Sequence, residues 1–364
     1  MKPKTKVGTG RGSAPGSATG RSMALKELSA YLGLSPSTVS RVINGGATAH
    51  RIAESTQRRV LETAAKFGYE ANIIARSLRQ KRTFTVGVLV PEISEGYSTA
   101  VLGGIEDGLL KEGLFYFVAS HRHHAELLEA YPRLMISRAV DGIIAVDTKI
   151  SEQIQIPVVA VSGHWHNQHA ISVELDHRHA AHLALEHLQK LGHQRIAFIK
   201  GQAFSSDTNR RWKAIREEAA KLGIAIDPEL TVQLHSPEPG PEPGHLAAQE
   251  LLSRKRPFSA IFSFNDVSAV GAISALREAG LQVPRDVSVV GFDDVLFAAT
   301  SHPPLTTVRQ PLREMGQMAA STLLGMIQKS DREHMPGTVI TVHPELVVRR
   351  STTRFTHYAM GNGA

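Results

Sequence analysis

The sequence predicts an α/β protein with a small all-helical head, followed by two lobes that are each built on a doubly wound parallel sheet. Three observations support this fold class. Residues 1–83 hold fifteen Lys or Arg against four Asp or Glu, a net charge of +11, whereas residues 84–364 carry a net charge of −4. The hydrophobic pattern changes at the same place, from short helical repeats to continuous apolar runs separated by helical stretches. About 270 residues of the second pattern exceed one comfortable core, so two lobes are expected.

Composition excludes several classes of protein. The chain has 364 residues and no Cys, so it has no disulfide scaffold, thiolate nucleophile or iron–sulfur centre. Its apolar runs are strand-sized, too short to cross a bilayer. Residues 1–21 resemble a disordered basic tail and lack the apolar region of a secretory signal, so a cytoplasmic location is expected. The basic first part indicates a polyanionic partner, either nucleic acid or an anionic membrane surface.

Residues 22–70 are predicted to form three short helices. Leu25, Leu28 and Leu32 recur at helical spacing until Gly33 breaks the run. A second helix begins after Ser35, the expected N-cap, and a third is expected at about residues 53–67. The predicted buried side chains of the third helix are Val60, Leu61, Ala64 and Phe67.

The second helix has the layout of a DNA-reading element in a helix-turn-helix. Short hydroxyl and amide side chains at a helix N-terminus can approach phosphates and base edges, and Arg41 can donate in a fork to guanine. The same pattern also fits an ordinary pair of helices with a solvated polar face, but the net charge of +11 favours DNA. The candidate residues for the major groove are Ser35, Pro36, Ser37, Thr38, Ser40, Arg41 and Asn44.

After residue 83, six apolar runs predict strands that are buried on both faces, with crossover helices between them. The predicted helices include 180–191 and 269–279. The predicted strands cover residues 86–90, 141–146, 157–161, 196–199, 259–262 and 287–291.

Five segments, in order along the chain, resemble the lactose-repressor (LacI/GalR) family of transcription regulators. They begin with Leu34-Ser35-Pro36-Ser37-Thr38-Val39-Ser40-Arg41-Val42-Ile43-Asn44-Gly45, which resembles the recognition helix of that family. The others are residues 68–79, 192–197, 283–294 and 303–311, and the resemblance extends from about residue 24 to residue 350.

The resemblance implies a hinge helix and linker at residues 71–83, a homodimer and a pseudo-palindromic DNA operator. In such regulators two hinge helices meet in the minor groove, where a Leu wedges between base pairs at an unstacking cost that DNA bending offsets. Leu78 stands at that place, although it could instead pack as a linker residue. The implied hinge contacts are Asn72, Ala75, Arg76 and Leu78.

The resemblance also implies that residues 84–350 form a bilobed, periplasmic-binding-protein-like domain for effector binding and dimerisation. The expected first lobe comprises about residues 84–162 and 295–325, and the second 163–294 and 326–350, followed by a tail at 351–364. A small-molecule effector is implied between the lobes.

Several polar residues are candidates for the effector site. Ser162, Asn265 and Asp293 each follow a predicted strand, and doubly wound sheets bind ligands at the carboxyl ends of their strands. By resemblance, Arg211 stands where an Arg contacts the ligand, and Asp207 precedes it by one helical turn. Tyr97, in the expected loop after the first strand, could supply an aromatic wall. Such donors and acceptors suit a hydroxyl-rich ligand, so a sugar or sugar derivative is expected.

Two other function classes are less consistent with the sequence. A solute-binding protein of the same bilobed fold would not need the basic helical head. An enzyme is not indicated, because there is no phosphate-binding GxxxxGK[ST] loop, no GxSxG elbow and no dinucleotide fingerprint at a strand–helix turn. The His residues cluster at 121–124, 164–169 and 177–182 without a shared ligand frame that includes a carboxylate, so neither a metal site nor a cofactor is predicted.

Overall fold

The computed structural model describes residues 23–43, 49–69, 77, 82–93, 96–150, 154–162, 170–236, 239–328 and 337–356. It divides the chain into two compact units, Met1–Thr83 and Phe84–Ala364. The predicted DNA contact Asn44 and the predicted hinge contacts Asn72, Ala75, Arg76 and Leu78 lie outside the described residues.

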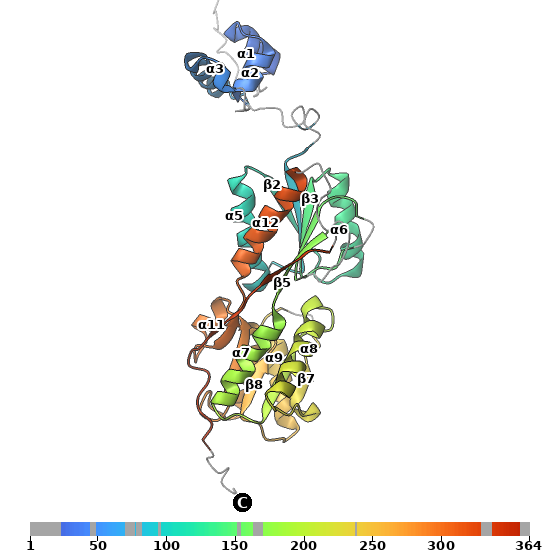
Figure 1. Ribbon diagram of the computed structural model, residues 1–364, viewed down its shortest axis with the longest axis vertical. Helices are drawn as coiled ribbons and strands as arrows, with labels where there is room; N and C mark the ends of the chain where they lie inside the picture. The colour runs from blue at the N-terminus through green and yellow to red at the C-terminus, as the bar shows by residue number, and fades with distance from the viewer. Residues whose placement is uncertain are drawn as a thin grey trace, which may run out of the picture. The chain divides into compact units, whose positions relative to one another are not determined.

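The first unit is helical, as predicted (Figure 1). Its small core is made by Leu28 and Leu32 of the first helix, Val39 and Val42 of the second, and Val60 with Ala64 of the third. These spacings place one apolar face of each helix toward the others. The elements are α1 (Leu25–Leu32), α2 (Pro36–Ile43), the 3₁₀ turn η1 (Ala49–Arg51) and α3 (Glu54–Lys66).

Local chemistry explains where these helices begin and end. Gly33 ends α1 with a φ of +65°, a conformation that a residue without Cβ adopts at little cost. The predicted N-cap is confirmed, because the backbone N–H of Thr38 donates to Ser35 Oγ at 3.2 Å. The predicted burial of Leu61 is wrong: its side chain is 51% exposed, because it follows the core residue Val60 and so lies about 100° further around the helix. Phe67 is only half-buried.

The second unit contains two six-stranded sheets. The sheet of the first lobe is parallel throughout, in the order β11-β5-β4-β3-β1-β2. Its strands are β1 (Thr85–Val90), β2 (Phe115–Ser120), β3 (Gly142–Val146), β4 (Val158–Val161), β5 (Ala170–Leu175) and β11 (Val339–Val342).

The sheet of the second lobe has the order β12-β10-β9-β8-β6-β7. All of its pairs are parallel except the pair of β10 with β12. Its strands are β6 (Ile196–Lys200), β7 (Thr231–Gln233), β8 (Ala260–Ser263), β9 (Ser288–Asp293), β10 (Thr306–Arg309) and β12 (Glu345–Val347). The six predicted strands and the predicted fold class of two doubly wound, mainly parallel lobes are confirmed.

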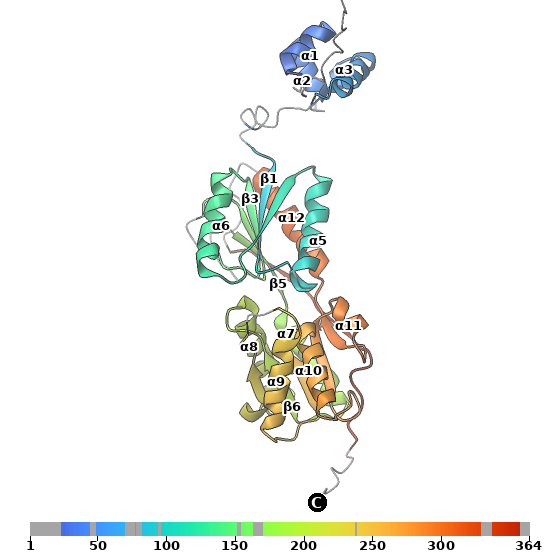
Figure 2. The same cartoon turned by 180° about the vertical axis from the view of Figure 1, so that it is seen from behind.

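Helices cover both faces of each sheet. In the first lobe α5 and α12 pack against one face and α6 against the other (Figures 1 and 2). In the second lobe α7 and α8 lie on one face, while α9 and α10 lie on the face that Figure 2 shows. The helices are α5 (Gly96–Lys111), α6 (Ala125–Ser137), α7 (His177–Lys190), α8 (Ser206–Lys221), α9 (Glu242–Ser253), α10 (Asp266–Glu278), α11 (Leu296–Thr300) and α12 (Leu312–Gln328), with the 3₁₀ turn η2 (Pro228–Leu230).

The expected lobe ranges need correction at three strands. β5 and β11 were expected in the second lobe, but both belong to the sheet of the first. β5 pairs in parallel with β4, and β11 pairs in parallel with β5. β10 was expected in the first lobe, yet it lies beside β9 in the second. The chain therefore passes between lobes after Leu175, after Arg309 and between Val342 and Glu345.

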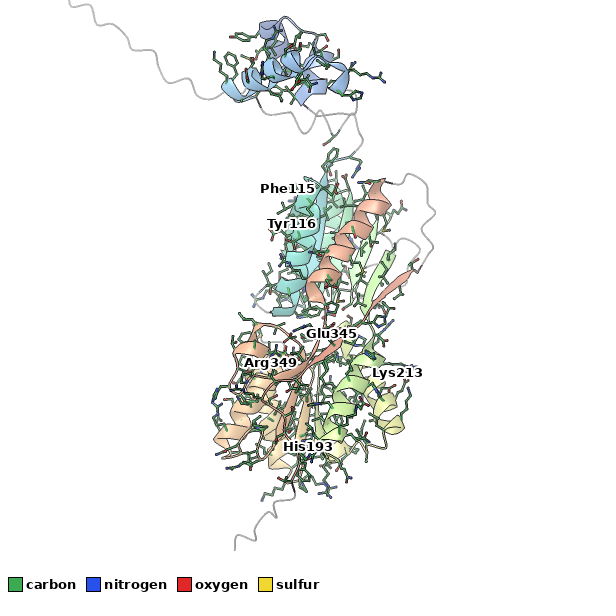
Figure 3. The ribbon with its side chains drawn as sticks, turned by 60° about the vertical axis from the view of Figure 1, so that its left-hand side comes forward. Phe115, Tyr116, His193, Lys213, Glu345 and Arg349 are labelled. Carbon is green, nitrogen blue, oxygen red and sulfur yellow. The ribbon has the colours of Figure 1, made fainter. Side chains whose placement is uncertain are left out.

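The expected C-terminal tail begins later than residue 351. Ser351 is fully buried, and its Oγ donates to the backbone carbonyl of Val289 at 2.6 Å. His193, labelled near the end of the second lobe in Figure 3, lies 3.0 Å from the carbonyl oxygen of Thr353 through its Nε2. Residues 351–356 are thus part of the lobe. Among the described residues, no helix combines the length and the hydrophobicity needed to span a membrane.

Candidate functional site

Helix α2 presents a polar row on the outside of the helical unit. Ser35, Pro36, Ser37 and Arg41 are exposed, while Thr38 and Ser40 are half-buried. Val39 and Val42 anchor the opposite face in the core. The six predicted DNA-contacting residues that the structure describes therefore lie on α2 or at its N-cap, four of them exposed, and their contact with DNA stays a prediction.

A cavity of about 130 Å³ lies where the carboxyl ends of strands from both lobes meet. Glu92 follows β1 and Asp147 follows β3 in the first lobe, whereas Gln202 follows β6, Asn265 follows β8 and Asp293 ends β9 in the second. This is the position at which doubly wound sheets hold ligands. Five of the six predicted effector residues line this cavity: Tyr97, Asp207, Arg211, Asn265 and Asp293.

Arg211 is held rigidly at the cavity wall. Its Nη2 donates to Asp207 Oδ2 at 3.2 Å, and its Nη1 donates to the carbonyl oxygen of Phe264 at 2.5 Å. The guanidinium carbon lies 3.7 Å from the ring centroid of Phe292 and 4.4 Å from that of Phe264. Arg211 and Asp207 are each 4% exposed and Phe292 is fully buried, whereas Phe264 is half-buried, so the guanidinium lies between a buried carboxylate and two aromatic rings.

Asp293 is a buried carboxyl group whose charge is only partly compensated. Burial raises its pKa to about 7, although the Arg211 guanidinium and a hydrogen bond from Gln310 act in the opposite direction. Gln310 Nε2 donates to Asp293 Oδ1 at 2.5 Å. At neutral pH this side chain can therefore accept a hydrogen bond as a carboxylate or donate one as an acid.

Asp147 was not among the predicted site residues, yet it lines the same cavity. The backbone N–H of Ser206 donates to its Oδ1 at 3.1 Å, and the hydroxyl of Ser205 donates to its Oδ2 at 3.3 Å. Burial and the nearby charge of Asp207 raise the pKa of Asp147. A signal was available in the sequence, because Asp147 follows an apolar strand just as Asp293 does.

Ser162 is the predicted effector residue that does not line the cavity. It is 1% exposed, and its Oγ accepts a hydrogen bond of 2.8 Å from the hydroxyl of Tyr97, which does line the cavity. Tyr97 itself lies in the first turn of α5, so its expected position in a loop is wrong. The helix begins at Gly96, sooner after β1 than the sequence suggested.

Asn265 caps a helix and also lines the cavity. It is the N-cap of α10, where its Oδ1 accepts from the backbone N–H of Ser268 at 2.8 Å. Because the oxygen is used in the cap, the amide NH₂ is the group that Asn265 can offer to a ligand.

Two aromatic side chains that the sequence did not indicate also line the cavity. His123 follows β2 in the first lobe and Phe204 follows β6 in the second, and their ring centroids are 3.9 Å apart. Their proximity depends on how the lobes pack, so no local pattern could predict it. In the described part of the chain, no group of three His, Asp or Glu side chains is arranged to hold a metal ion.

His121 supports this region, and its burial predicts a pH effect on stability. Burial and the neighbouring His123 lower the pKa of His121 to about 4 from 6.5. Because the folded pKa is lower, the stabilisation from neutral His121 is present above pH 6.5 and is lost as the pH falls toward 4, by up to about 3 kcal/mol. Urea unfolding across this pH window should therefore show a smaller loss for His121→Gln than for the wild type. Equal losses would contradict a buried neutral His121.

Comparison with known proteins agrees with this architecture. Residues 185–352 match the family model of a periplasmic binding protein-like domain. The HTH-type transcriptional repressor PurR of Aliivibrio fischeri (strain MJ11) is 30% identical over 338 residues, which cover 90% of this chain and 97% of that protein. The solved lac repressor dimer bound to operator and the anti-inducer ONPF has a TM-score of 0.78 at 24% identity, covering 92% of this chain and 100% of that one. A CelR–cellobiose complex has a TM-score of 0.66 at 26% identity, covering 90% and 99%.

The helical unit, the bilobed domain and the cavity define a helix-turn-helix transcription regulator with a ligand-binding domain. The homologues and structural neighbours are likewise transcription regulators and not enzymes. The chain belongs to the LacI/GalR family. The match covers 90% of this chain and 97% of a protein named an HTH-type transcriptional repressor, which favours a regulator over a solute-binding protein.

Proposed function

We propose that this protein is a sequence-specific transcription repressor, controlled by a sugar or sugar derivative that binds between its two lobes. The observation that carries the proposal is the combination, in one chain, of an exposed polar row on α2 and a cavity lined by hydrogen-bonding groups from both lobes. The PurR relative is named a repressor, the lac repressor structure is a dimer on its operator, and the CelR structure holds cellobiose.

In this proposal a homodimer places two α2 helices in successive major grooves of a pseudo-palindromic operator. Arg41 reads a base, and the hydroxyl groups of Ser35, Ser37 and Thr38 approach phosphates and base edges. The hinge contacts predicted from the sequence bind the minor groove. An effector that prefers one arrangement of the lobes changes operator affinity by its difference in affinity for the two arrangements.

The sugar assignment rests on the chemistry of the cavity. Asp293 and Asp147 can accept hydrogen bonds from hydroxyl groups, whereas Asn265 and Gln202 can donate them. Aromatic and apolar groups such as Phe204 provide a surface for the carbon skeleton of a ring. A cavity with convergent polar groups and an apolar surface is typical of small-molecule sites.

Arg41→Ala tests the DNA-reading role. With an operator first selected from a random DNA pool, the substitution should cost roughly 1–3 kcal/mol of discrimination between operator and random DNA, because a forked contact to a base is lost. Fluorescence anisotropy titrations measure both affinities. The control Arg58→Ala removes an exposed charge from α3 of the same unit and should preserve discrimination. Equal weakening on operator and random DNA by Arg41→Ala would show that Arg41 contacts only phosphate.

A further inference from the structure

The cavity has more carboxyl groups than cationic groups. Asp147 comes from the first lobe, whereas Asp207 and Asp293 come from the second, and Glu92 lies at the cavity wall. Among the described residues that line the cavity, Arg211 is the one Arg or Lys. The charge of the wall is therefore negative when these groups are ionised.

Asp207 has its own partners. It pairs with Arg211 at 3.2 Å, and its Oδ1 lies 3.3 Å from His177 Nε2. Asp207 and Arg211 are 4% exposed, so this pair is compensated inside the protein and presents little charge to a ligand.

Asp147 and Asp293 are held by neutral donors. Ser205 and Ser206 donate hydrogen bonds to Asp147, and Gln310 donates one to Asp293. No Lys or Arg in the described part of the chain forms an ion pair with either carboxyl group. Arg211 does not form an ion pair with Asp293. Its positive charge lowers the pKa of Asp293, but burial raises that pKa by more. Asp293 is 5% exposed and Asp147 is half-buried, so ionising both groups would leave two partly or fully desolvated charges that are not paired with a Lys or Arg, which is costly.

Arg211 has one guanidinium N–H group that lacks a hydrogen-bond acceptor among the described residues. Its Nε is buried and has no hydrogen-bond partner among the described residues, although the residue lines the cavity. A buried N–H requires an acceptor, and a guanidinium N–H is well matched to a hydroxyl or ring oxygen. The ligand that completes this site therefore carries oxygen atoms as well as a group that compensates carboxylates.

We infer that the effector is an amine-bearing sugar, whose ammonium group binds between Asp147 and Asp293 while its oxygen atoms accept from Arg211. This inference rests on the proposed function and names the chemical class of its effector. A phosphorylated or carboxylated sugar would bring another negative charge to two carboxyl groups and is disfavoured. A neutral sugar would leave the carboxyl groups uncompensated or protonated.

The test is a thermal-shift and calorimetric comparison on the full chain near neutral pH. The probes are glucosamine, galactosamine and mannosamine, each with its N-acetyl form, its parent hexose and its 6-phosphate. At least one amine should bind roughly tenfold to a hundredfold more tightly than its N-acetyl form, since acetylation removes the charge that the carboxylates stabilise. Preference for a hexose, N-acetyl form or phosphate would overturn the inference, as would the absence of binding by all three amines.

Two substitutions localise the preference. Asp147→Asn and Asp293→Asn should each reduce the ratio of amine to N-acetyl affinity by about tenfold, because each removes one carboxylate. The control Glu126→Gln changes a side chain that is 75% exposed on α6, and it should leave the ratio unchanged. An unchanged ratio in both Asp variants, with their thermal unfolding still cooperative, would contradict the placement of the ammonium group.

The same samples separate this inference from the proposed function. An amine could bind with the expected preference without changing the affinity of the protein for the selected operator. In that case the proposed control of DNA binding by the effector is wrong, whereas the assignment of the ligand as an amine-bearing sugar is retained. If operator affinity responds to a neutral or phosphorylated sugar instead, the proposed function stands and the amine assignment is wrong.

Discussion

Replacing Arg211 with Met is expected to lower the free energy of unfolding by about 3–5 kcal/mol, the typical cost of leaving a buried charge without its partner. Asp207, 4% exposed, would lose its guanidinium partner. The carbonyl of Phe264 would lose its donor, and the rings of Phe264 and Phe292 would lose the cation that lies against them. Met has a similar length, so the effect measures the loss of charge and hydrogen bonds more than the loss of volume.

Urea unfolding followed by circular dichroism measures this change. Lys213→Met is the matched control, because Lys213 lies on the same helix with its side chain 71% exposed (Figure 3). It should change the free energy of unfolding by less than about 0.5 kcal/mol. A loss below about 1 kcal/mol for Arg211→Met would mean that the Arg211–Asp207 pair contributes no more than a surface ion pair does.

Gly104→Ala is expected to destabilise the protein by about 3 kcal/mol, although Ala normally favours a helix. A Cβ at Gly104 of α5 would lie 1.9 Å from the backbone carbonyl oxygen of Arg313 in α12, and one at Gly316 would lie 2.1 Å from that of Val101. The two helices therefore approach each other through reciprocal glycines. Because backbone atoms block the added methyl group, relief requires the helices to separate.

Gly325→Ala provides a control of opposite sign. Gly325 lies on the same helix α12, but a Cβ there would meet no atom within 4 Å. The substitution should raise the free energy of unfolding by roughly 0.5–1 kcal/mol through helix propensity alone. Thermal and urea unfolding of both variants would reveal the sign difference. Stabilisation by Gly104→Ala would show that the close crossing of α5 and α12 is not rigid.

The sequence predicts the fold best where burial is complete. The strands β1, β3, β4, β6, β8 and β9 are continuous apolar runs, so their pattern is unmistakable. The edge strand β2 carries Tyr116 and Ser120, and β10 begins with two Thr, so their composition resembles that of surface segments. The lobe ranges were wrong for a related reason, since nothing local in β5 or β10 specifies which sheet it joins.

The residues of the candidate site divide in the same way, into those that a strand pattern in the sequence predicts and those that only the folded structure brings together. Asn265 and Asp293 could be placed because each follows a buried strand, and the strand-end rule would also have placed Asp147. Ser162 also follows a buried strand, but it does not line the cavity. Its Oγ accepts a hydrogen bond from the hydroxyl of Tyr97, which does line the cavity. The pair of His123 and Phe204 joins two lobes, and only the packed structure brings them together.

The strand order has a consequence for synthesis of the protein on the ribosome. The sheet of the first lobe needs β11 beside β5, and its helix α5 needs α12 to cover it, so residues 312–342 must emerge before that lobe is complete. The second lobe likewise waits for β12 and Ser351. A growing chain that has reached residue 300 would expose the apolar faces of both lobes at once, and such surfaces promote aggregation. Nascent chains of this protein should therefore depend on chaperones until the last fifth of the sequence has been made.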